Sequence, residues 1–586
     1  MVKKMSKKQA KDLKERNTKI NLILYFIMFL FVVVGMRLVY LQVLISNELR
    51  QKAQMDLAKQ LVVKGERGII FDTNGEKLAT NIDVANITAS PFVIKKSKVN
   101  SISSKLASIL NIEKKVIFKK LSKKTRFVKI ADKVSGIEAE KIRKLHMPGI
   151  YIDDDFKRQY PNGKLASAVL GFTNKENLGL EGIESKLDGL LKGRTLKIKV
   201  KKDGKGYVLN TDKVRKAKLD GSSIVLAIDS QIQSICERHL EDAVQKNRAK
   251  SGIVVAMQPF TGDLLAIAHY PNFDPNNFNK YNKSVFRNRS VTDAFEPGSA
   301  MKVFTAAIAL EKGFTSESEF FCENGKYKPG KHMIHDTHPY GMLTIQEIIK
   351  FSSNIGTAKI AEALGNQTIY EYFKSFGFGS KTNIKFAGET RGIFPNAKRW
   401  SKHEGRTISF GHGIASSAIQ LTTAVSAIAN GGNLMTPILV KKIMARKGNI
   451  ERVYEPKIRK RVISSKTANK IKTIMSLVVD GGTGIKAAID GYSVCGKTGT
   501  AQKTLKNQKG YSKDKYLSLF AGFAPFNNPK LTILVIIDEP KGQYYASEVA
   551  APVFKNIMSE SFSYLDIPPE KQREKVLAFV SQDKNK

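Results

Sequence analysis

The chain is organised around one stretch, Glu296-Pro297-Gly298-Ser299-Ala300-Met301-Lys302, and the apolar run 303–310 that follows it. The proline and the glycine interrupt the preceding segment, Ser299 is a favourable residue for opening a helix, and Gly313 supplies a stop. The pattern therefore predicts a helix over residues 299–312. Because this helix is apolar all round, we expect it to lie inside a domain, with Lys302 buried in its first turn.

Burial gives Lys302 a chemistry that a surface lysine lacks. Desolvation disfavours the ammonium form, and so does the positive end of the helix dipole, so both effects lower the pKa of Lys302. Ser299 and Lys302 are three residues apart and share one face of the helix. A neutral Lys302 can therefore accept the proton of Ser299, and the same helix end can stabilise an oxyanion.

The Ser-x-x-Lys pattern alone is weak evidence for a catalytic pair. In this lysine-rich chain it also occurs at Ser512 to Lys515 and at Ser581 to Lys584, both in polar surroundings. Taken by itself, the pair at Ser299 is as often structural as catalytic. The rest of the chain has to decide between these interpretations.

Length and charge set the broad class of the protein. At 586 residues with 42% hydrophobic content, the chain should form two or three domains with substantial cores. The formal net charge of +44 is compatible with nucleic acid, anionic lipid or an acidic polymer as partner. The lysines are spread along the whole chain, which favours a general enrichment of every surface over one binding patch.

The sequence pattern of the amino terminus predicts a membrane anchor. Residues 1–19 form a basic tail, and residues 20–44 begin with the almost wholly apolar run from Ile20 to Tyr40, which is long enough to cross a bilayer if Arg37 reaches the far interface. No small-x-small site for cleavage of a signal peptide follows the run. We therefore expect an uncleaved anchor with the basic tail in the cytoplasm and the remaining chain outside, which argues against nucleic acid as a partner.

Three cysteines are too few and too scattered for a disulfide framework, and no spacing of Cys and His suggests a metal site. We expect Cys236, Cys322 and Cys495 to be free and mostly buried.

Residues 45–221 contain no set of side chains that suggests an active site. The segment 67–79 reads as two strands joined by a turn at Asn74-Gly75, residues 102–121 have helical spacing, and short glycine-punctuated motifs follow. This part is predicted to be a mixed, elongated spacer, or pedestal, that holds the next domain away from the membrane.

Residues 222–562 are predicted to form one α+β domain, followed by a short charged tail over 563–586. Strand-like runs occur at both ends, and helical material, including 343–364 and 416–429, lies between them. The strand-like runs are 223–228, 252–257, 264–268, 492–502, 517–523 and 531–537. We expect the first and last segments to complete a single antiparallel sheet.

Two further elements of this domain offer chemistry. Ser352-Ser353-Asn354 supplies hydroxyls and an amide that can face Ser299. Lys497-Thr498-Gly499-Thr500 supplies an ammonium group and hydroxyls suited to a carboxylate, with glycines that allow a backbone or substrate to approach closely. Singly, the first is usually a cap or turn and the second a strand end.

The order of these three motifs resembles that of the penicillin-binding proteins and serine β-lactamases. The resemblance to a penicillin-binding protein extends over nearly the full chain, and the pedestal is similar to the dimerisation-type domain of the class B members. Three segments carry that similarity: Arg67-Gly68 through Leu78-Ala79, Tyr160-Pro161 and Gly182-Ile183-Glu184. Phe410-Gly411-His412-Gly413, in the carboxy-terminal domain, also fits the family. Residues 287–299 look most like those of the FtsI-type cell-division transpeptidases. The resemblance implies a transpeptidase fold with a five-stranded antiparallel sheet flanked by helices.

The resemblance also implies a role for each motif residue and no cofactor. Ser299 would be the nucleophile, Lys302 the base and Ser352 a proton relay, with the N–H groups of Ser299 and Thr500 as oxyanion hole. Substrate binding would fall to Asn354, Lys497, Thr498, Gly499 and Thr500. The donor would be the D-Ala-D-Ala end of a peptidoglycan stem peptide, the acceptor an amine of a neighbouring stem, and β-lactams would be covalent inhibitors.

The implied setting is the inner membrane, crossed once, with the catalytic domain on the periplasmic side. Since no glycan-polymerising domain is evident, the family suggests an FtsW-type membrane polymerase and other division proteins as partners. The alternatives are an elongation-type transpeptidase, a D,D-carboxypeptidase, a β-lactamase and a scaffold without catalytic activity. Two departures from the family pattern are Ala300, where threonine is more usual, and Ala546-Ser547-Glu548, where a glycine pair is common.

Overall fold

The computed structural model describes residues 7–49, 58–202, 208–209, 219–330, 332–445, 449–504 and 510–570. The chain divides into two compact units, one made of residues 1–65 and 194–219 and the other of residues 66–193 and 220–586. The predicted pedestal range 45–221 is thus divided between the units, and the predicted boundary at 221/222 stays a prediction.

The first unit contains the predicted anchor. Helix α1 (Lys7–Val39) continues into a short π-helical segment, Tyr40–Leu44, and its apolar part is long enough to cross a membrane. The same unit has a small antiparallel sheet of β1 (Ala58–Lys64), β6 (Thr195–Lys202) and β7 (Val208–Leu209).

The second unit begins with a seven-stranded sheet. Its order is β17 (Ile450–Val453), β16 (Val440–Met444), β8 (Ser223–Leu226), β2 (Ile70–Phe71), β3 (Lys77–Ala89) and β4 (Val128–Ser135), and β5 (Ile150–Gln159) also pairs with β3. The predicted turn at Asn74-Gly75 joins β2 to β3, and Gly75 has φ +90° there. The run 223–228 is indeed a strand, but it pairs with β2 and β16 instead of joining the antiparallel sheet of the predicted 222–562 domain. Alternation of apolar residues predicts a strand but does not name its partner.

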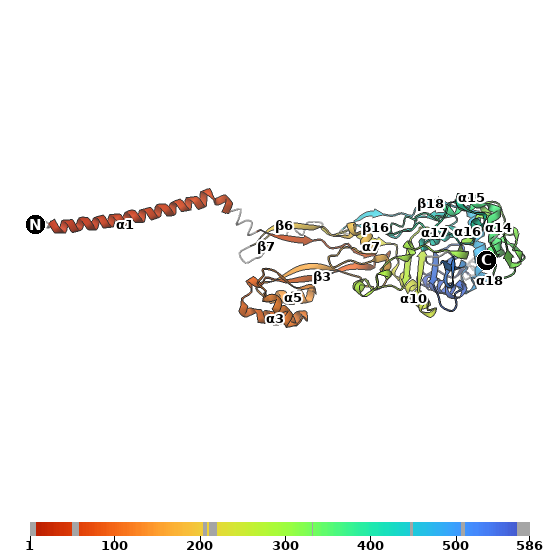
Figure 1. Ribbon diagram of the computed structural model, residues 1–586, viewed down its shortest axis with the longest axis horizontal. Coiled ribbons are helices and arrows are strands. Elements are labelled where there is room, and N and C mark those ends of the chain that lie inside the picture. The colour runs from red at the N-terminus through yellow and green to blue at the C-terminus, as the bar shows by residue number, and fades with distance from the viewer. Residues whose placement is uncertain are drawn as a thin grey trace, which may run out of the picture. The chain divides into compact units, whose positions relative to one another are not determined.

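A small lobe lies at the far end of β3 and β5. The predicted helical segment 102–121 is two helices, α3 (Lys96–Leu110) and α4 (Lys114–Leu121), which pack with α5 (Gly136–Lys144) on a core of their own (Figure 1). The break between α3 and α4 falls at Asn111, which has φ +50°.

A buried charge cluster explains the short motifs of the pedestal. The Glu184 carboxylate is 2.5 Å from Nε of Arg67 and 2.6 Å from Nε of Arg158, and it accepts a hydrogen bond from the Tyr160 hydroxyl. Arg67 also pairs with Asp188 at 2.6 Å. Since a buried charge is tolerated only when it is paired, the residues of this cluster depend on one another.

The predicted 222–562 domain contains the expected antiparallel sheet. Its order is β10 (Leu264–Tyr270), β9 (Ser251–Met257), β21 (Leu531–Asp538), β20 (Tyr511–Ala524) and β19 (Cys495–Thr504). The early strand β9 pairs with the late strand β21 as expected, although the run 223–228 stays outside this sheet. One face packs against α10 (Ser230–Lys246) and α20 (Ala551–Tyr564), and the other against α17 (Ala418–Ala429). β19 and β10 are the two edge strands.

Helices fill the middle of this domain, as predicted. A 3₁₀ turn, Gly298–Met301, leads into α12 (Lys302–Glu311), and the predicted helical segment 343–364 is α13 (Ile345–Phe351) followed by α14 (Asn354–Leu364). The predicted free and buried state of the three cysteines is confirmed.

The remaining α-helices of the described chain are α6 (Ser167–Leu170), α7 (Gly182–Lys186), α8 (Asp188–Leu191), α11 (Arg289–Thr292), α15 (Asn366–Ser375), α16 (Lys402–Ser409), α18 (Ser465–Gly481) and α19 (Ala546–Val549). The small paired strands are β11 (Glu319–Phe321) with β14 (Met342–Thr344), β12 (Lys326–Tyr327) with β13 (Ile334–His335), and β15 (Asn433–Met435) with β18 (Ile458–Arg461).

Candidate active site

Ser299 lies in the 3₁₀ turn that opens α12. Its side chain is half-buried and has no hydrogen-bond partner among the residues that the structure describes. The turn is held from behind by another loop, since the Gly298 N–H donates to the carbonyl of Gly411 at 3.3 Å. A Cβ atom on Gly411 would lie 2.1 Å from the Gly298 carbonyl oxygen, so only glycine permits this contact.

Lys302 is fully buried, as the sequence predicts. Its Nζ donates hydrogen bonds to the carbonyl oxygen of Ser352 at 2.5 Å and to the Ser352 hydroxyl at 3.2 Å. Burial lowers the pKa of Lys302 to about 7, although the negative charge of Asp336 opposes the shift. Near neutral pH, a large fraction of this lysine is therefore an uncharged amine.

Lys497 approaches the same serine from β19. Its Nζ is buried and donates to the Ser352 hydroxyl at 3.0 Å and to Oγ1 of Thr498 at 3.3 Å. Burial holds the pKa of Lys497 well below its usual range, and the charge of Lys302 lowers that pKa further. The Ser352 oxygen thus accepts from two lysines, which leaves the proton of this hydroxyl available for donation elsewhere.

A break between two helices presents Ser352. Its backbone is left-handed, with φ +62°, and ends α13. Ser353 then caps α14 by accepting from the Gly356 N–H at 2.9 Å. The predicted cap or turn and the predicted chemical site therefore coincide in one segment.

Asp336 anchors this segment, although no motif in the sequence points to it. Its carboxylate accepts from the Ser353 hydroxyl at 2.5 Å, from the Asn354 N–H at 2.5 Å and from the Ile355 N–H at 3.1 Å. The Asn354 side chain donates to the carbonyl of His335 at 2.8 Å. Asp336 satisfies the free N–H groups at the start of α14 and so fixes where Ser352 and Asn354 lie.

The edge strand β19 lies directly against the turn of Ser299. A Cβ atom on Gly499 would lie 2.7 Å from the Pro297 carbonyl oxygen, and one on Gly298 would lie 3.4 Å from the Thr500 carbonyl oxygen. The glycines thus serve the close backbone approach that the sequence predicts. On an edge strand, backbone groups that face away from β20 are not used by the sheet.

Two threonine hydroxyls connect β19 to its surroundings. Oγ1 of Thr498 lies 2.9 Å from Oγ1 of Thr483, and Oγ1 of Thr500 accepts from the Ala546 N–H at 3.1 Å. The departure at residues 546–548 therefore leaves a backbone contact between Ala546 and β19. The hydroxyl proton of Thr500 stays available, because that oxygen acts as an acceptor in the contact.

A second cluster, formed by Glu296, His412 and Tyr511, borders the site. Oε1 of Glu296 accepts from the Gly413 N–H at 3.0 Å and from the Tyr511 hydroxyl at 3.3 Å, and burial raises the pKa of Glu296. The ring of His412 lies edge-on to Tyr511 at 5.6 Å. Burial and the charge of Lys302 lower the pKa of His412 to about 4, so at neutral pH this residue adds no positive charge.

All the predicted motif residues therefore meet in one region. The Ser352 hydroxyl accepts from both Lys302 and Lys497, and the turn that carries Ser299 approaches β19 closely at Gly298 and Thr500. The arrangement places a half-exposed hydroxyl near a buried amine, a second hydroxyl with a free proton and a strand edge with donors. These groups can support acyl transfer through a serine ester.

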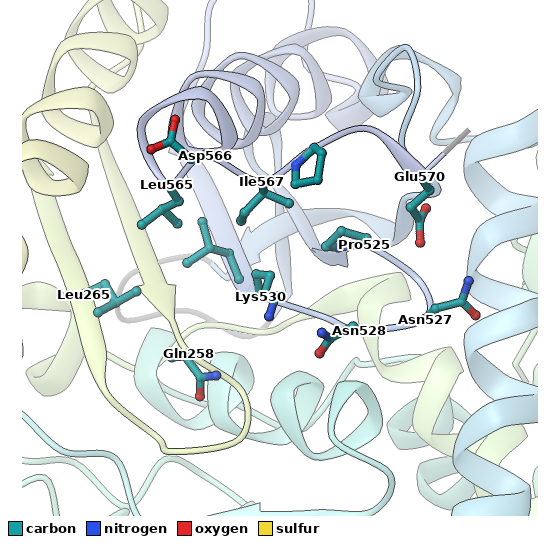
Figure 2. A pocket seen from close by; sticks show the side chains of 12 residues that line it. Gln258, Leu265, Pro525, Asn527, Asn528, Lys530, Leu565, Asp566, Ile567 and Glu570 are labelled. Atoms are coloured by element: carbon teal, nitrogen blue, oxygen red, sulfur yellow. The ribbon is translucent and has the colours of Figure 1, made fainter. Parts of the chain in front are cut away.

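Another cavity, of about 630 Å³, lies elsewhere in the domain (Figure 2). Its lining contains no Ser, Thr, Cys or His and none of the motif residues. The lining residues are Gln258, Leu265, Pro525, Asn527, Asn528, Lys530, Leu531, Leu565, Asp566, Ile567, Pro568 and Glu570. Without a hydroxyl or thiol nucleophile in its lining, this cavity is not a candidate for the same chemistry.

Comparison with known proteins agrees with this geometry. Residues 252–559 match the penicillin-binding protein transpeptidase domain, and residues 62–226 match the penicillin-binding protein dimerisation domain. The chain is 35% identical over 570 residues to the peptidoglycan D,D-transpeptidase FtsI of Buchnera aphidicola, covering 94% of this chain and 96% of the relative. It is 34% identical over 568 residues to the probable peptidoglycan D,D-transpeptidase PenA of Neisseria meningitidis, covering 96% and 95%. A crystal structure of penicillin-binding protein 3 from Mycobacterium tuberculosis in complex with aztreonam is similar at a TM-score of 0.68 and 25% identity, covering 87% of this chain and 98% of that one.

Proposed function

The chain belongs to the class B penicillin-binding proteins, the FtsI-type peptidoglycan D,D-transpeptidases, and on that premise we propose that Ser299 carries the acyl group in a reaction driven by Lys302 and Ser352. The observation that supports this most is the position of the Ser352 hydroxyl, which accepts from the Nζ atoms of both Lys302 and Lys497 next to the turn of Ser299. The pairing joins two distant segments of the sequence to the helix that follows the nucleophile.

The first half of the reaction forms the acyl-enzyme. Neutral Lys302 takes the proton of Ser299, and Oγ of Ser299 attacks the carbonyl carbon of the penultimate D-Ala. The N–H groups of Ser299 and Thr500 hold the oxyanion. When the peptide C–N bond breaks, Ser352 donates its proton to the leaving D-Ala amine and regains one from the ammonium of Lys302.

The second half transfers the acyl group to an amine of a neighbouring stem peptide. The amine attacks the ester carbonyl, its proton passes through Ser352 to Lys302, and Oγ of Ser299 leaves and is reprotonated. No oxidant, metal or cofactor is needed for this atom balance. Attack by water instead of the amine would make the enzyme a carboxypeptidase.

Substrate binding falls to the remaining motif residues. Lys497 and the hydroxyls of Thr498 and Thr500 would hold the terminal carboxylate, which suits an ammonium group flanked by hydroxyl donors. Gly499 keeps the strand close to the nucleophile, and Asn354 would bind an amide of the stem peptide. Two contacts set the position of Asn354. Its backbone N–H donates to the carboxylate of Asp336, and its side-chain amide donates to the carbonyl of His335.

The cellular setting follows from the membrane helix and the family. The chain is a single-pass membrane protein, and we place its basic amino terminus in the cytoplasm and its catalytic domain on the periplasmic side of the inner membrane. We place its activity at the division septum. An FtsW-type glycan polymerase and other division proteins are the partners that this role requires.

The function is tested by product analysis. With uncrosslinked peptidoglycan strands bearing pentapeptide stems, the full chain in lipid nanodiscs is expected to release D-Ala and form crosslinked dimers of stems. Release of D-Ala with tetrapeptide alone would make it a carboxypeptidase. Turnover of penicillin at a rate comparable to that of peptide would make it a β-lactamase.

The pH dependence of acylation is a second expected outcome. Since only the neutral amine of Lys302 can accept a proton, the rate of acylation by a labelled penicillin should fall as pH falls through about 7 and level off above it. His412, with a pKa near 4, stays neutral over this range and should not contribute. A rate that stays constant from about pH 5.5 to about pH 8.5 would contradict Lys302 as the base.

A further inference from the structure

A second pocket joins the pedestal to the catalytic domain. It has a volume of about 490 Å³. Leu187, between α7 and α8, lines it from the pedestal, and Val440 and Ile443 of β16 line it from the other part. The apolar lining is formed by Leu187, Ile384, Pro437, Ile438, Leu439, Val440 and Ile443. A cavity of this size and character suits a small organic molecule.

Positive charge surrounds this apolar lining. Lys385, Lys457 and Arg459 also line the pocket, and Glu455 is the only carboxylate among the lining residues. The Nζ of Lys385 lies 4.1 Å from the centre of the Tyr454 ring, which holds that ammonium group at the pocket. An anion in the pocket would therefore meet up to three cations.

Arg459 is the lining cation that is partly buried without an ion pair in the described chain. Its side chain is half-buried, and its one hydrogen bond within the described chain runs from Nη2 to the carbonyl of Lys381 at 3.2 Å. No carboxylate forms an ion pair with it in the part of the chain that the structure covers. Burial lowers the pKa of Arg459, opposed by the charge of Glu389. A guanidinium that has lost water without gaining a carboxylate favours binding of an anion.

The loop that forms one wall is held in an unusual conformation. Asn383 and Lys385 both have left-handed backbones, at φ +67° and +59°, and between them Ile384 is turned into the buried wall. Non-glycine residues adopt this conformation at a cost and only where the surroundings impose it. Next to this loop, Glu389 accepts hydrogen bonds from the N–H and the hydroxyl of Thr382.

From these observations we infer that this pocket, the Arg459 pocket, binds an organic anion: a carboxylate or phosphate attached to an apolar body. The anionic group lies against Arg459 with Lys457 and Lys385 beside it, and the apolar body lies on Ile384, Val440 and Ile443. The ligand thereby contacts both the pedestal, through Leu187, and the catalytic domain. This site shares no residue with the Ser299 site and stands independently of the mechanism above.

The inference is tested with a soluble probe pair that shares one apolar body and differs in the head group, which is a carboxylate in one probe and a neutral alcohol in the other. The full chain in zwitterionic nanodiscs is titrated with 4-(4-fluorophenyl)butyrate or with the neutral 4-(4-fluorophenyl)butan-1-ol, and binding is followed by ¹⁹F line broadening against empty nanodiscs. We expect the acid to bind about tenfold or more tightly than the alcohol, as a charge-assisted hydrogen bond allows. Inorganic phosphate should compete only weakly, because it lacks the apolar body.

Variants locate the site. Arg459→Gln should abolish the preference for the acid, whereas Lys460→Gln removes the same charge from the next residue of β18, whose ammonium contacts Ser375 outside the pocket, and should retain it. Lys457→Gln, at an exposed position, should reduce the preference for the acid, and this second test does not depend on the half-buried guanidinium. Thermal unfolding and acylation by penicillin should match the parent chain in all three.

Three results would overturn the inference: no binding of the acid to the parent chain at its solubility limit, equal binding of acid and alcohol, or an unchanged preference in Arg459→Gln. None of these results bears on the transpeptidase mechanism, because the Ser299 site is read out separately by penicillin.

Discussion

Replacing Ser299 by alanine is expected to abolish both acylation by penicillin and peptide crosslinking while leaving the fold intact. The hydroxyl of Ser299 makes no hydrogen bond within the described structure and is half-exposed, so its removal leaves no buried group without a partner. The variant should therefore express and unfold at the temperature of the parent chain. In cells that depend on this protein for division, it should fail to complement.

The chain supplies a matched control for this replacement. Ser512 also stands three residues before a lysine, but its hydroxyl donates to Asp514 at 2.6 Å on β20 and lies outside the candidate site. Ser512→Ala should keep full acylation and complementation. If Ser299→Ala complemented as well, the protein would act as a scaffold in division and the catalytic proposal would fail.

Replacing Lys302 by methionine is expected to slow acylation of Ser299 by about 10³-fold, the range of a lost general base. Methionine is close to lysine in length and fits a fully buried site, so the effect should report chemistry more than packing. The loss should appear in the acylation rate measured with a labelled penicillin, and the remaining rate should no longer fall as pH decreases through about 7.

Lys515→Met is the control for this change, because Lys515 is exposed and occupies the equivalent position in the second Ser-x-x-Lys pattern. Its acylation rate should equal that of the parent chain. A normal acylation rate in Lys302→Met would remove Lys302 from the role of base and leave Lys497, which also donates to the Ser352 hydroxyl, as the other amine at the site.

Much of this site could be predicted because its parts are local in sequence. The helix after Ser299 follows from an apolar run between two stops, and burial of Lys302 follows from that run. The antiparallel sheet was predictable in outline because strand-like runs cluster at the two ends of the domain. The motif trio then supplied what periodicity does not, namely that segments about 50 and 200 residues after Ser299 belong beside it.

The site residues and the strand pairing that the sequence did not predict depend on contacts between distant segments, which leave no local pattern in the sequence. Asp336 stands in an unremarkable loop, and its importance comes from three hydrogen bonds to the start of α14. Thr483 matters only because Thr498 lies opposite. Glu296 and His412 were within quoted motifs, but their contacts with Tyr511 depend on how β20 begins. The pairing of β8 with β2 was hidden for the same reason, because alternation predicts a strand and not its neighbour.

The neutral state of Lys302 connects these observations. Burial alone lowers its pKa, and the carboxylate that opposes the shift is the one that anchors Ser352 and Asn354. Asp336 thus has two effects, since it fixes the position of the relay and restrains the fall in the pKa of Lys302. The value of about 7 that results places both protonation states of Lys302 within reach during one catalytic cycle.

The most direct measurement is mass spectrometry of the chain after exposure to penicillin, with the adduct located by peptide mapping. The account predicts one covalent adduct with the mass of the intact antibiotic, carried by Ser299, and none in Ser299→Ala. An adduct on any other residue, or no stable adduct on the folded chain, would contradict it.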